Sequence, residues 1–305
     1  MSNQVPRLDD TRLSFIEFQT PAASETPPTG AGWVHEIKFD GYRTQVIVEP
    51  ERARAYSKSG LNWSDKYWPI TLAARNLPCK TAILDGEVIV NNEKGISDFH
   101  ALARAIRKSP GKLVFVAFDL LHLDGEDLRS LPLLERKAKL RTLLDGSHDC
   151  IQYSEHFEEE GTVFFNACDR LGLEGIISKR ADSRYRSGPS KSWLKTKCYA
   201  FGEFDVLGVE TTRTGEPVAL LASKESGRYA GSAFVTLKRS DRERFWRNIE
   251  KLKTSQAATP ISRIRSNRIQ WVRPGLTASV RYLKGEEKLR HASLTGINSE
   301  DPDET

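Results

Sequence analysis

Strand-like runs recur along the chain of 305 residues and constrain its fold more than any other feature. Short apolar or alternating stretches lie at 33–39, 44–49, 52–57, 82–90, 113–121, 174–179 and 204–210. Helical patterns separate them at about 98–108, 132–144 and 160–171. Because 38% of the residues are hydrophobic, the chain can build substantial cores. Strands interleaved with helices in this way predict a mixed α+β protein.

The pattern of the sequence changes after Lys197. Short strand-like runs with glycine-bearing turns follow, then a helical pattern at about 240–252 and a strand-like run at 276–284. A small β-barrel after a larger α+β domain fits this order, with the boundary at 199–203. Residues 1–29, which include a stretch rich in Pro, Thr and Ser, are interpreted as an extended leader, and regular structure is expected from Trp33. We therefore predict domains at 30–200 and 201–305.

Basic residues are concentrated late in the chain, although the net charge of the whole chain is only +5. Residues 238–290 hold fifteen Lys and Arg against five Asp and Glu. This asymmetry suggests an anionic polymer such as nucleic acid as the partner; the alternative is a solvated basic helix over 241–253.

Several features predict a cytoplasmic protein. No apolar run approaches the roughly 18 residues that a membrane span needs, and the N-terminus has no apolar signal-peptide stretch. The four cysteines are widely scattered, with no CxxC pair, which is typical of reduced structural thiols.

The stretch HEIKFDGYR, residues 35–43, places Lys38 two residues before an Asp-Gly pair and five before Arg43. Taken alone, it predicts a strand, a turn that carries the Asp-Gly pair and a second strand, with Lys38 as a solvated side chain near a strand end. Three further segments, LDGEVIV, EGIISK and WLKTK, also put charged residues at strand ends. Buried charges are costly unless they pair with one another or with a ligand, so together these segments predict a site.

In their order and spacing these motifs resemble the covalent nucleotidyltransferase superfamily, which contains DNA ligases, RNA ligases and capping enzymes. The runs PPTGAGWVHEIKFDGYR, FVAFDLLHLDGEDLRSLPLLERK, LGLEGIISKRADSRYRSG, SWLKTKC and LRHASLTG are most similar to the ligase domain of bacterial ligase D, over about residues 20–296. The resemblance implies an ATP-dependent DNA ligase of end joining, with a nucleotidyltransferase (adenylation) domain followed by an OB-fold barrel. The alternatives are an RNA ligase, a capping-type guanylyltransferase, or a degenerate DNA-end-binding module without catalytic activity.

The resemblance also implies roles for individual residues. Lys38 matches the nucleophile that takes AMP from ATP, and a free lysine amine is scarce near pH 7. Its pKa is therefore expected to be lowered by desolvation and by three cations, which would also contact phosphate: Arg43, Lys195 and Lys197. Glu87 and Glu174 match positions for ribose and a divalent metal, Mg²⁺ or Mn²⁺. Further contacts to base, ribose or DNA are expected from Glu36, Phe118 and Lys58, the last standing where arginine is common.

Two segments need separate interpretation. A second LDGE, at 123–126, is expected to be a hairpin turn because no long apolar run continues from it. After LRHASLTG the family pattern runs on to Arg, two acidic residues and Lys, where this sequence has Asn298, Ser299, Glu300 and Asp301. We expect the missing cations to slow the first step of the reaction.

The implied partners are DNA with nicks or ends, the end-binding protein Ku, and polymerase or phosphoesterase modules. We expect the protein to be a monomer that associates with the nucleoid when it binds DNA.

Overall fold

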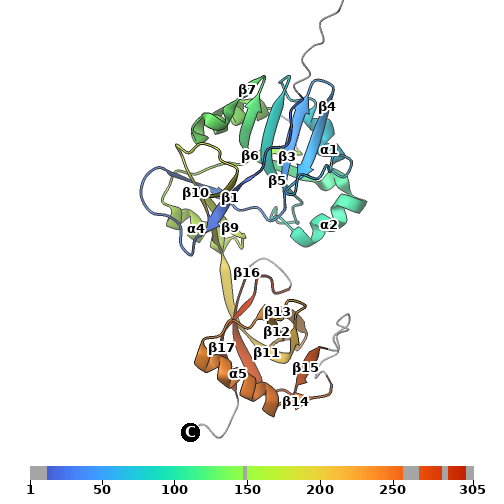
Figure 1. The fold of residues 1–305 in the computed structure, drawn as a ribbon, viewed down its shortest axis with the longest axis vertical. Coiled ribbons are helices and arrows are strands. Elements are labelled where there is room, and N and C mark those ends of the chain that lie inside the picture. The colour runs from blue at the N-terminus through green and yellow to red at the C-terminus, as the bar shows by residue number, and fades with distance from the viewer. Residues whose placement is uncertain (1–11, 147–149, 257–267, 284–287, 300–305) are drawn as a thin grey trace, which may run out of the picture. The chain divides into compact units, whose positions relative to one another are not determined.

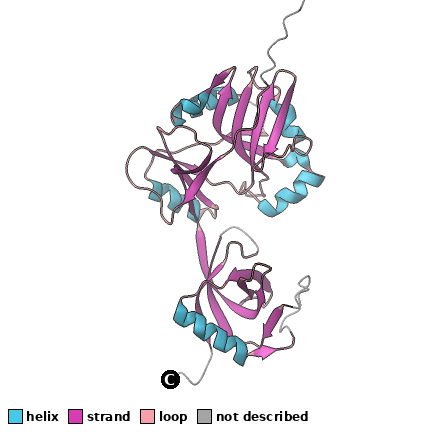
Figure 2. Cartoon of the chain, in the orientation of Figure 1, coloured by secondary structure: helices cyan, strands magenta, loops and turns pink. Residues whose placement is uncertain are grey.

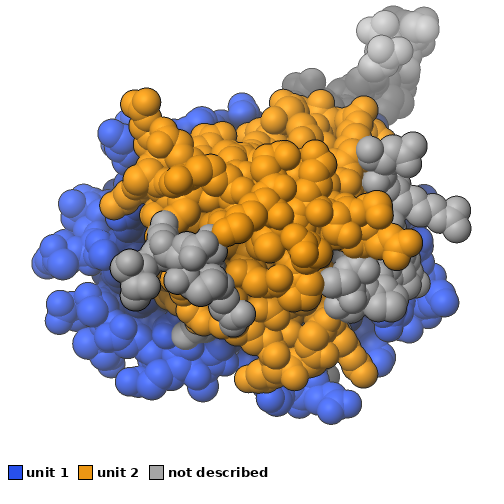
Figure 3. All heavy atoms as spheres, turned by 90° about the horizontal axis from the view of Figure 1, so that it is seen from below, with its two compact units in different colours: residues 1–196 blue, residues 197–305 orange. Residues whose placement is uncertain are grey.

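The computed structural model describes residues 12–146, 150–256, 268–283 and 288–299. The chain divides into two compact units, residues 1–196 and 197–305, which Figure 3 colours separately. The sequence predicted this division at 200/201. Within the described residues, no helix is long and apolar enough to cross a membrane.

Unit 1 contains a large sheet covered by helices (Figures 1 and 2). Its strands, in spatial order, are β4 (Arg52–Ser57), β3 (Tyr42–Glu49), β5 (Ala82–Ile89), β6 (Val114–Leu123) and β7 (Glu126–Asp127), and β8 (Ile151–Tyr153) also pairs with β6. The helices are α1 (Trp68–Ala74), α2 (Phe99–Lys108) and α3 (Leu133–Leu144), and two 3-10 turns lie at Pro110–Lys112 and Leu128–Ser130. Fully buried Ile70, Leu102 and Leu140 pack from the helices into the core. The predicted strands and the helices at 98–108 and 132–144 are thus confirmed, whereas the short α1 was not predicted.

A smaller sheet completes unit 1. Its order is β1 (Gln19–Ala23), β10 (Gly188–Lys197), β9 (Gly175–Arg180) and β2 (Trp33–Ile37), with α4 (Gly161–Arg170) packed against β9 and β2. The expectation that regular structure begins at Trp33 is wrong, because β1 pairs in parallel with β10. Phe18 and Gln19 are buried, so residues within the predicted leader belong to the folded unit.

The Asp-Gly segment joins the two sheets rather than forming a hairpin. Both predicted strands exist, but β2 pairs with β9 in the small sheet and β3 pairs with β4 and β5 in the large one. A Cβ on Gly41 would lie 2.3 Å from the Val88 carbonyl oxygen, so only glycine allows the crossing segment to approach β5 this closely. Lys38 therefore directly follows β2, at the place where the chain passes from one sheet to the other.

The second LDGE sequence is a hairpin, as predicted. It joins β6 to β7, with Leu123 opposite Glu126. Asp124 and Gly125 have φ values of 46° and 90°, the left-handed conformation that a two-residue hairpin requires.

Unit 2 is built around a barrel of five strands. The order β11 (Tyr199–Thr211), β12 (Pro217–Ser223), β13 (Tyr229–Phe234), β17 (Ser293–Ser299), β16 (Leu276–Leu283) closes through pairing of β16 with β11. Only the β13–β17 pair among these is parallel. Two short strands, β14 (Lys253–Thr254) and β15 (Ile269–Val272), continue the sheet from β11. The helix α5 (Arg239–Lys251) packs Phe245 and Ile249 into the barrel core.

Candidate active site

A pocket of about 730 Å³ lies in unit 1 and is lined from both of its sheets. This volume is typical of sites for small molecules. The sequence-predicted residues that line the pocket are Glu36, Lys38, Arg43, Lys58, Glu87, Phe118 and Lys195. Glu174 reaches the same region by contacting Lys38, whereas Lys197, two residues beyond Lys195 on β10, is not among the lining residues. The four separate motifs of the sequence therefore do converge.

Lys38 is positioned by the pairing of β2 with β9. Ile37 lies opposite Ile176, and the backbone N–H of Lys38 donates to the Gly175 carbonyl at 2.9 Å. This pairing brings the Lys38 Nζ into an ion pair with the Glu174 carboxylate. The two side chains are 19% and 7% exposed, so the amine is reachable from the pocket while its partner is buried.

Arg43 is held by Asp85, a residue that sequence reasoning missed. Its Nε and Nη2 donate to the two carboxylate oxygens of Asp85 at 2.6 and 2.7 Å. The guanidinium carbon lies 4.9 Å from the ring centre of Phe18, 4.5 Å from that of Phe118 and 5.6 Å from that of Trp193. Asp85 therefore balances the charge of Arg43, one of the three cations expected near Lys38. The available signal was its position two residues before Glu87, on the same face of β5.

Glu36 is enclosed by two buried lysines, which sequence reasoning also missed. Lys137 and Lys179 lie 2.9 and 2.8 Å from its carboxylate oxygens. Burial tends to raise the pKa of Glu36, but the charges and hydrogen bonds of these lysines outweigh it and lower the pKa. Burial lowers the pKa of Lys179 to about 8, against the opposing effect of Glu36. The Glu36 carboxylate is thus ionised and fixed in place at the wall of the pocket.

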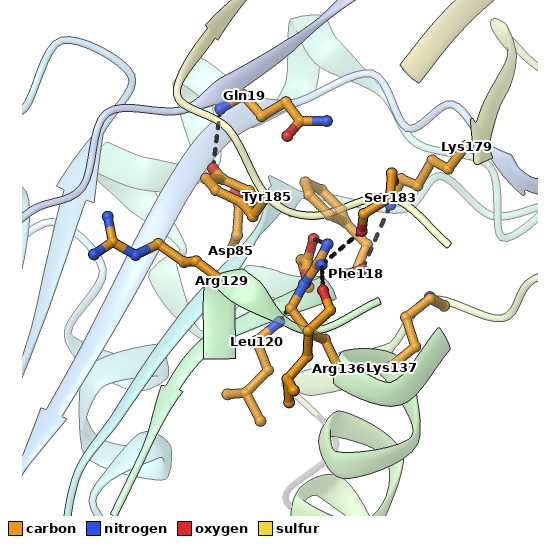
Figure 4. Close-up of polar contacts among 12 residues, drawn as sticks. Gln19, Asp85, Phe118, Leu120, Arg129, Arg136, Lys137, Lys179, Ser183 and Tyr185 are labelled. Carbon is orange, nitrogen blue, oxygen red and sulfur yellow. Dashed lines mark hydrogen bonds and ion pairs between the residues drawn. The ribbon is translucent and has the colours of Figure 1, made fainter. Parts of the chain in front are cut away.

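Phe118 forms part of the same wall but is only 8% exposed. It meets Trp193 edge-on, with ring centres 6.1 Å apart and an interplanar angle of 81°. The Nζ of Lys179 lies 4.4 Å from the Phe118 ring centre and 3.4 Å from its carbonyl oxygen, a contact drawn in Figure 4. Phe118 therefore offers only a small part of its ring to a ligand in the pocket.

Glu87 is a carboxyl group whose pKa is strongly raised. Burial raises its pKa to about 8, the Arg43 and Lys38 charges oppose this, and Glu174 and Asp85 add to it. Glu87 and Glu174 therefore lie close enough to affect one another. Within the described residues, no cluster of three or more metal-ligating side chains is present.

The raised pKa of Glu87 has a testable consequence for stability. Between about pH 4.5 and 8 the folded chain keeps a proton on Glu87 that the unfolded chain has released. The free energy of unfolding of the native protein should therefore fall as pH rises through this window, relative to Glu87→Gln, whose amide does not titrate. Denaturant unfolding of both proteins in metal-free buffer at several pH values measures the difference. A difference that is independent of pH would contradict the raised pKa.

Comparison with known proteins identifies the family. The family model described as "ATP dependent DNA ligase domain" matches residues 22–197. The chain belongs to the ATP-dependent DNA ligase domain family. The multifunctional non-homologous end joining protein LigD of Pseudomonas aeruginosa is 31% identical over 313 residues, covering 94% of this chain and 36% of that protein. LigD of Mycobacterium bovis is 29% identical over 276 residues, covering 87% and 36%. This ligase-family chain thus spans about a third of the length of these relatives.

Solved ligase structures agree with this assignment. The ligase domain of M. tuberculosis LigD matches with a TM-score of 0.56 and 26% identity, covering 93% of this chain and 96% of that one. A mycobacterial DNA ligase D complexed with ATP and MES matches with a TM-score of 0.54 and 27% identity, covering 92% and 95%. A Lig E DNA ligase, 16% identical with a TM-score of 0.63, shares the fold.

Unit 2 of this ligase-family chain carries many of its exposed cations. Exposed side chains include Lys238, Arg239, Arg242, Arg247, Lys251, Lys253, Arg268, Arg273 and Lys288. Three others of the predicted basic region, Arg263, Arg265 and Lys284, lie outside the described residues. At the departure from the family pattern, Asn298 lies in β17 and donates to Glu203 at 3.0 Å, and Glu300 and Asp301 are outside the described residues.

Proposed function

We propose that this chain joins a DNA 5′-phosphate to a 3′-hydroxyl through a lysyl-AMP and a DNA-adenylate, and that it acts in repair by end joining. The observation that carries the proposal is a lysine at the pocket wall, placed after β2 and paired with a buried glutamate, Glu174, that directly precedes β9. A single reactive amine beside arginine, lysine and carboxylate groups suits transfer of a phosphoryl-linked nucleotide.

In the first step the Lys38 amine attacks the α-phosphorus of ATP, so an N–P bond forms, the bond to pyrophosphate breaks and the amine loses a proton. Attack needs a free amine, so the Lys38–Glu174 ion pair must separate beforehand. Lys195, which lines the pocket, would stabilise the negative charge that develops on the phosphate oxygens. In the second step a DNA 5′-phosphate takes the AMP from Lys38, and in the third a 3′-hydroxyl displaces AMP and seals the strand.

Nucleotide recognition is assigned to the fixed wall of the pocket. The ionised Glu36 would accept a hydrogen bond from the adenine amino group, and Phe118 would contact the base beside it. Arg43 and Lys58 would contact ribose, phosphate or DNA. Lys197 does not line the pocket, and we propose that it contacts phosphate only when the nucleotide is bound.

The donor chemistry fits a hard divalent cation, Mg²⁺ or Mn²⁺. Glu87 and Glu174 are carboxylates that influence one another's charge, and such ions complete their coordination with phosphate oxygens and water. When bound, the cation would neutralise negative charge on the phosphates. Glu87 and Glu174 would hold this cation, and the Lys38 amine is available for attack once Glu174 no longer pairs with it.

We infer that unit 1 is the nucleotidyltransferase domain and unit 2 an OB-fold. With the five barrel strands numbered in chain order, their order around the barrel is 1-2-3-5-4-1, and α5 lies between the third and fourth strands in the chain. This arrangement supports the OB assignment. Its exposed cations suit the phosphate backbone of DNA, so binding should weaken as salt rises and should depend little on sequence. The protein would work as a cytoplasmic, nucleoid-associated monomer with Ku and with polymerase or phosphoesterase modules.

One experiment tests the proposal against its rivals. The protein is incubated with α-labelled ATP or GTP and Mg²⁺, and the labelled protein is then chased with nicked DNA or nicked RNA. Label from ATP that moves to DNA and seals the nick is expected. Label from GTP, transfer to RNA alone, or no label at all would each overturn it. The rate of labelling by ATP in the same experiment tests whether the first step is slow, as we expect from the missing cations at residues 298–301.

Lys195→Met should slow labelling by ATP about 100-fold, because one preorganised charge on the reacting phosphate is lost. Lys191→Met is the matched control, since Lys191 lies on the same strand but is exposed and does not line the pocket. Rapid-quench measurement of protein–AMP formation at saturating ATP, without DNA, compares the two. Equal rates for both variants would remove Lys195 from the first step.

A further inference from the structure

An N-terminal strap, defined here as residues 13–23, forms one wall of the pocket. Phe18, Thr20 and Pro21 are among the lining residues. Most of the strap precedes residues 22–197, the part matched by the ligase family model. Residues 13–21 of the strap, which include the three that line the pocket, therefore lie outside the family match.

Reciprocal hydrogen bonds attach the strap to the large sheet. The Ile16 N–H donates to the Gln45 side-chain oxygen at 2.8 Å, and the Gln45 amide nitrogen donates back to the Ile16 carbonyl at 3.0 Å. Nearer the strap's start, Arg54 donates to the Leu13 carbonyl at 2.7 Å. A segment bound in this way has a defined position rather than a loose one.

Gln19 is the strap residue most tightly connected to the site. It is fully buried, and four of its polar groups are hydrogen-bonded. The side chain accepts from the Arg186 N–H at 2.6 Å and donates to Ser192 Oγ at 3.2 Å, which links it to the segment leading into β10 and to β10 itself. Its carbonyl accepts from Arg43 Nη2 at 3.3 Å, and its N–H donates to the Tyr185 hydroxyl at 3.0 Å (Figure 4).

The Tyr185 hydroxyl links Gln19 to Asp85 through two hydrogen bonds. It donates to Asp85 Oδ2 at 2.8 Å, the same oxygen that accepts from Arg43 Nη2. Gln19, Tyr185 and Asp85 are all buried, so loss of the Tyr185 hydroxyl would leave the Gln19 N–H without its acceptor and Asp85 with one donor fewer. Within the described residues, the hydrogen bonds of Arg43 use Nε and Nη2, which leaves the Nη1 donors for a ligand.

We propose that Gln19 and Tyr185 are positioning residues for nucleotide binding, which fix Arg43 through Asp85 and couple docking of the strap to occupation of the pocket by ATP. The inference rests on the proposed function, because it takes Arg43 to be a nucleotide contact. A docked strap holds the guanidinium between Asp85, the Gln19 carbonyl and three aromatic rings. The bound nucleotide in turn would hold Arg43 and so keep the strap in place, because coupling between two sites is reciprocal.

Tyr185→Phe tests the coupling with almost no change in shape. The KM for ATP in protein–AMP formation should rise about tenfold, while the rate at saturating ATP changes little, because the variant loses binding rather than chemistry. Gln19→Ala should raise the KM similarly. Tyr67→Phe is the matched control: Tyr67, like Tyr185, is a buried tyrosine, but it does not line the pocket, and the KM of this variant should equal that of the native protein.

A second measurement does not depend on catalysis. Hydrogen exchange of the strap amides should slow when ATP is added to the native protein in metal-free buffer, and should be faster at Gln19 in Tyr185→Phe. An unchanged KM in Tyr185→Phe and in Gln19→Ala, with native protein that is labelled normally, would overturn this inference and leave the proposed function standing. Native protein that takes no label would overturn the proposed function itself. Strap exchange that is indifferent to ATP would overturn the coupling in either case.

Discussion

Lys38→Ala should form no detectable protein–AMP with ATP and Mg²⁺, a loss of at least roughly 1,000-fold in the first step. The reason is chemical, because alanine offers no nucleophile and the other lysines that line the pocket, Lys58, Lys179 and Lys195, come from other segments of the chain. Gel detection of label transferred from α-labelled ATP measures the effect. The third step does not use the lysine as a nucleophile, so the variant should still seal a nick that is already adenylylated.

Two controls make that result decisive. Lys112→Ala removes an exposed lysine from a 3-10 turn, and its labelling should match that of the native protein. Sealing of the pre-adenylylated nick reports whether Lys38→Ala is folded. A labelled Lys38→Ala protein would mean that the nucleophile is misassigned, and loss of both activities would point to misfolding instead.

Asp119→Ala should lower the free energy of unfolding by about 3–5 kcal/mol, because it leaves a buried guanidinium without its counter-charge. Arg136 and Asp119 are both fully buried, and Arg136 Nε and Nη2 lie 2.7 and 2.8 Å from the two carboxylate oxygens. The remaining Arg136 nitrogen donates to the Leu131 carbonyl and to the Ser183 carbonyl. The second contact attaches the segment between β9 and β10 to α3 (Figure 4). Urea denaturation measures the loss.

A similar pair at the surface supplies the control. Arg129 contacts Asp127 with its Nε and Nη2, yet the two side chains are 42% and 56% exposed. Solvent screens an exposed pair, so Asp127→Ala should cost at most about 1 kcal/mol. Equal losses for the two variants would contradict the importance given to burial.

Much of the secondary structure could be predicted, because it follows from the local pattern of apolar and polar residues. The strand-like runs and the helices at 98–108, 132–144 and 160–171 correspond to β2 to β6, β9, β11 and to α2, α3 and α4. The strap could not be predicted, because its burial depends on distant partners such as Tyr185 and β10. The passage of the chain from the small sheet to the large sheet at Asp40-Gly41 could not be predicted either. Alternation of apolar and polar residues indicates a strand but not the strand with which it pairs.

The candidate site was also predicted only in part. Residues in motifs, such as Lys38, Glu36 and Lys195, could be named from the sequence, and the structure brings them to one pocket. The groups that fix them were missed: Asp85 for Arg43, and Lys137 with Lys179 for Glu36. A charged residue on an amphipathic helix usually lies on the solvated face. Nothing in the local sequence therefore indicated that Lys137 is completely buried.

The most direct test of the account is to locate the nucleotide after the first step. The native protein is incubated with ATP and Mg²⁺ in the absence of DNA, digested under conditions that preserve the N–P bond, and mapped by mass spectrometry. The account predicts one AMP adduct, on the peptide that contains Lys38, which disappears when nicked DNA is added. An adduct on any other lysine, or none on protein that binds ATP, would contradict it.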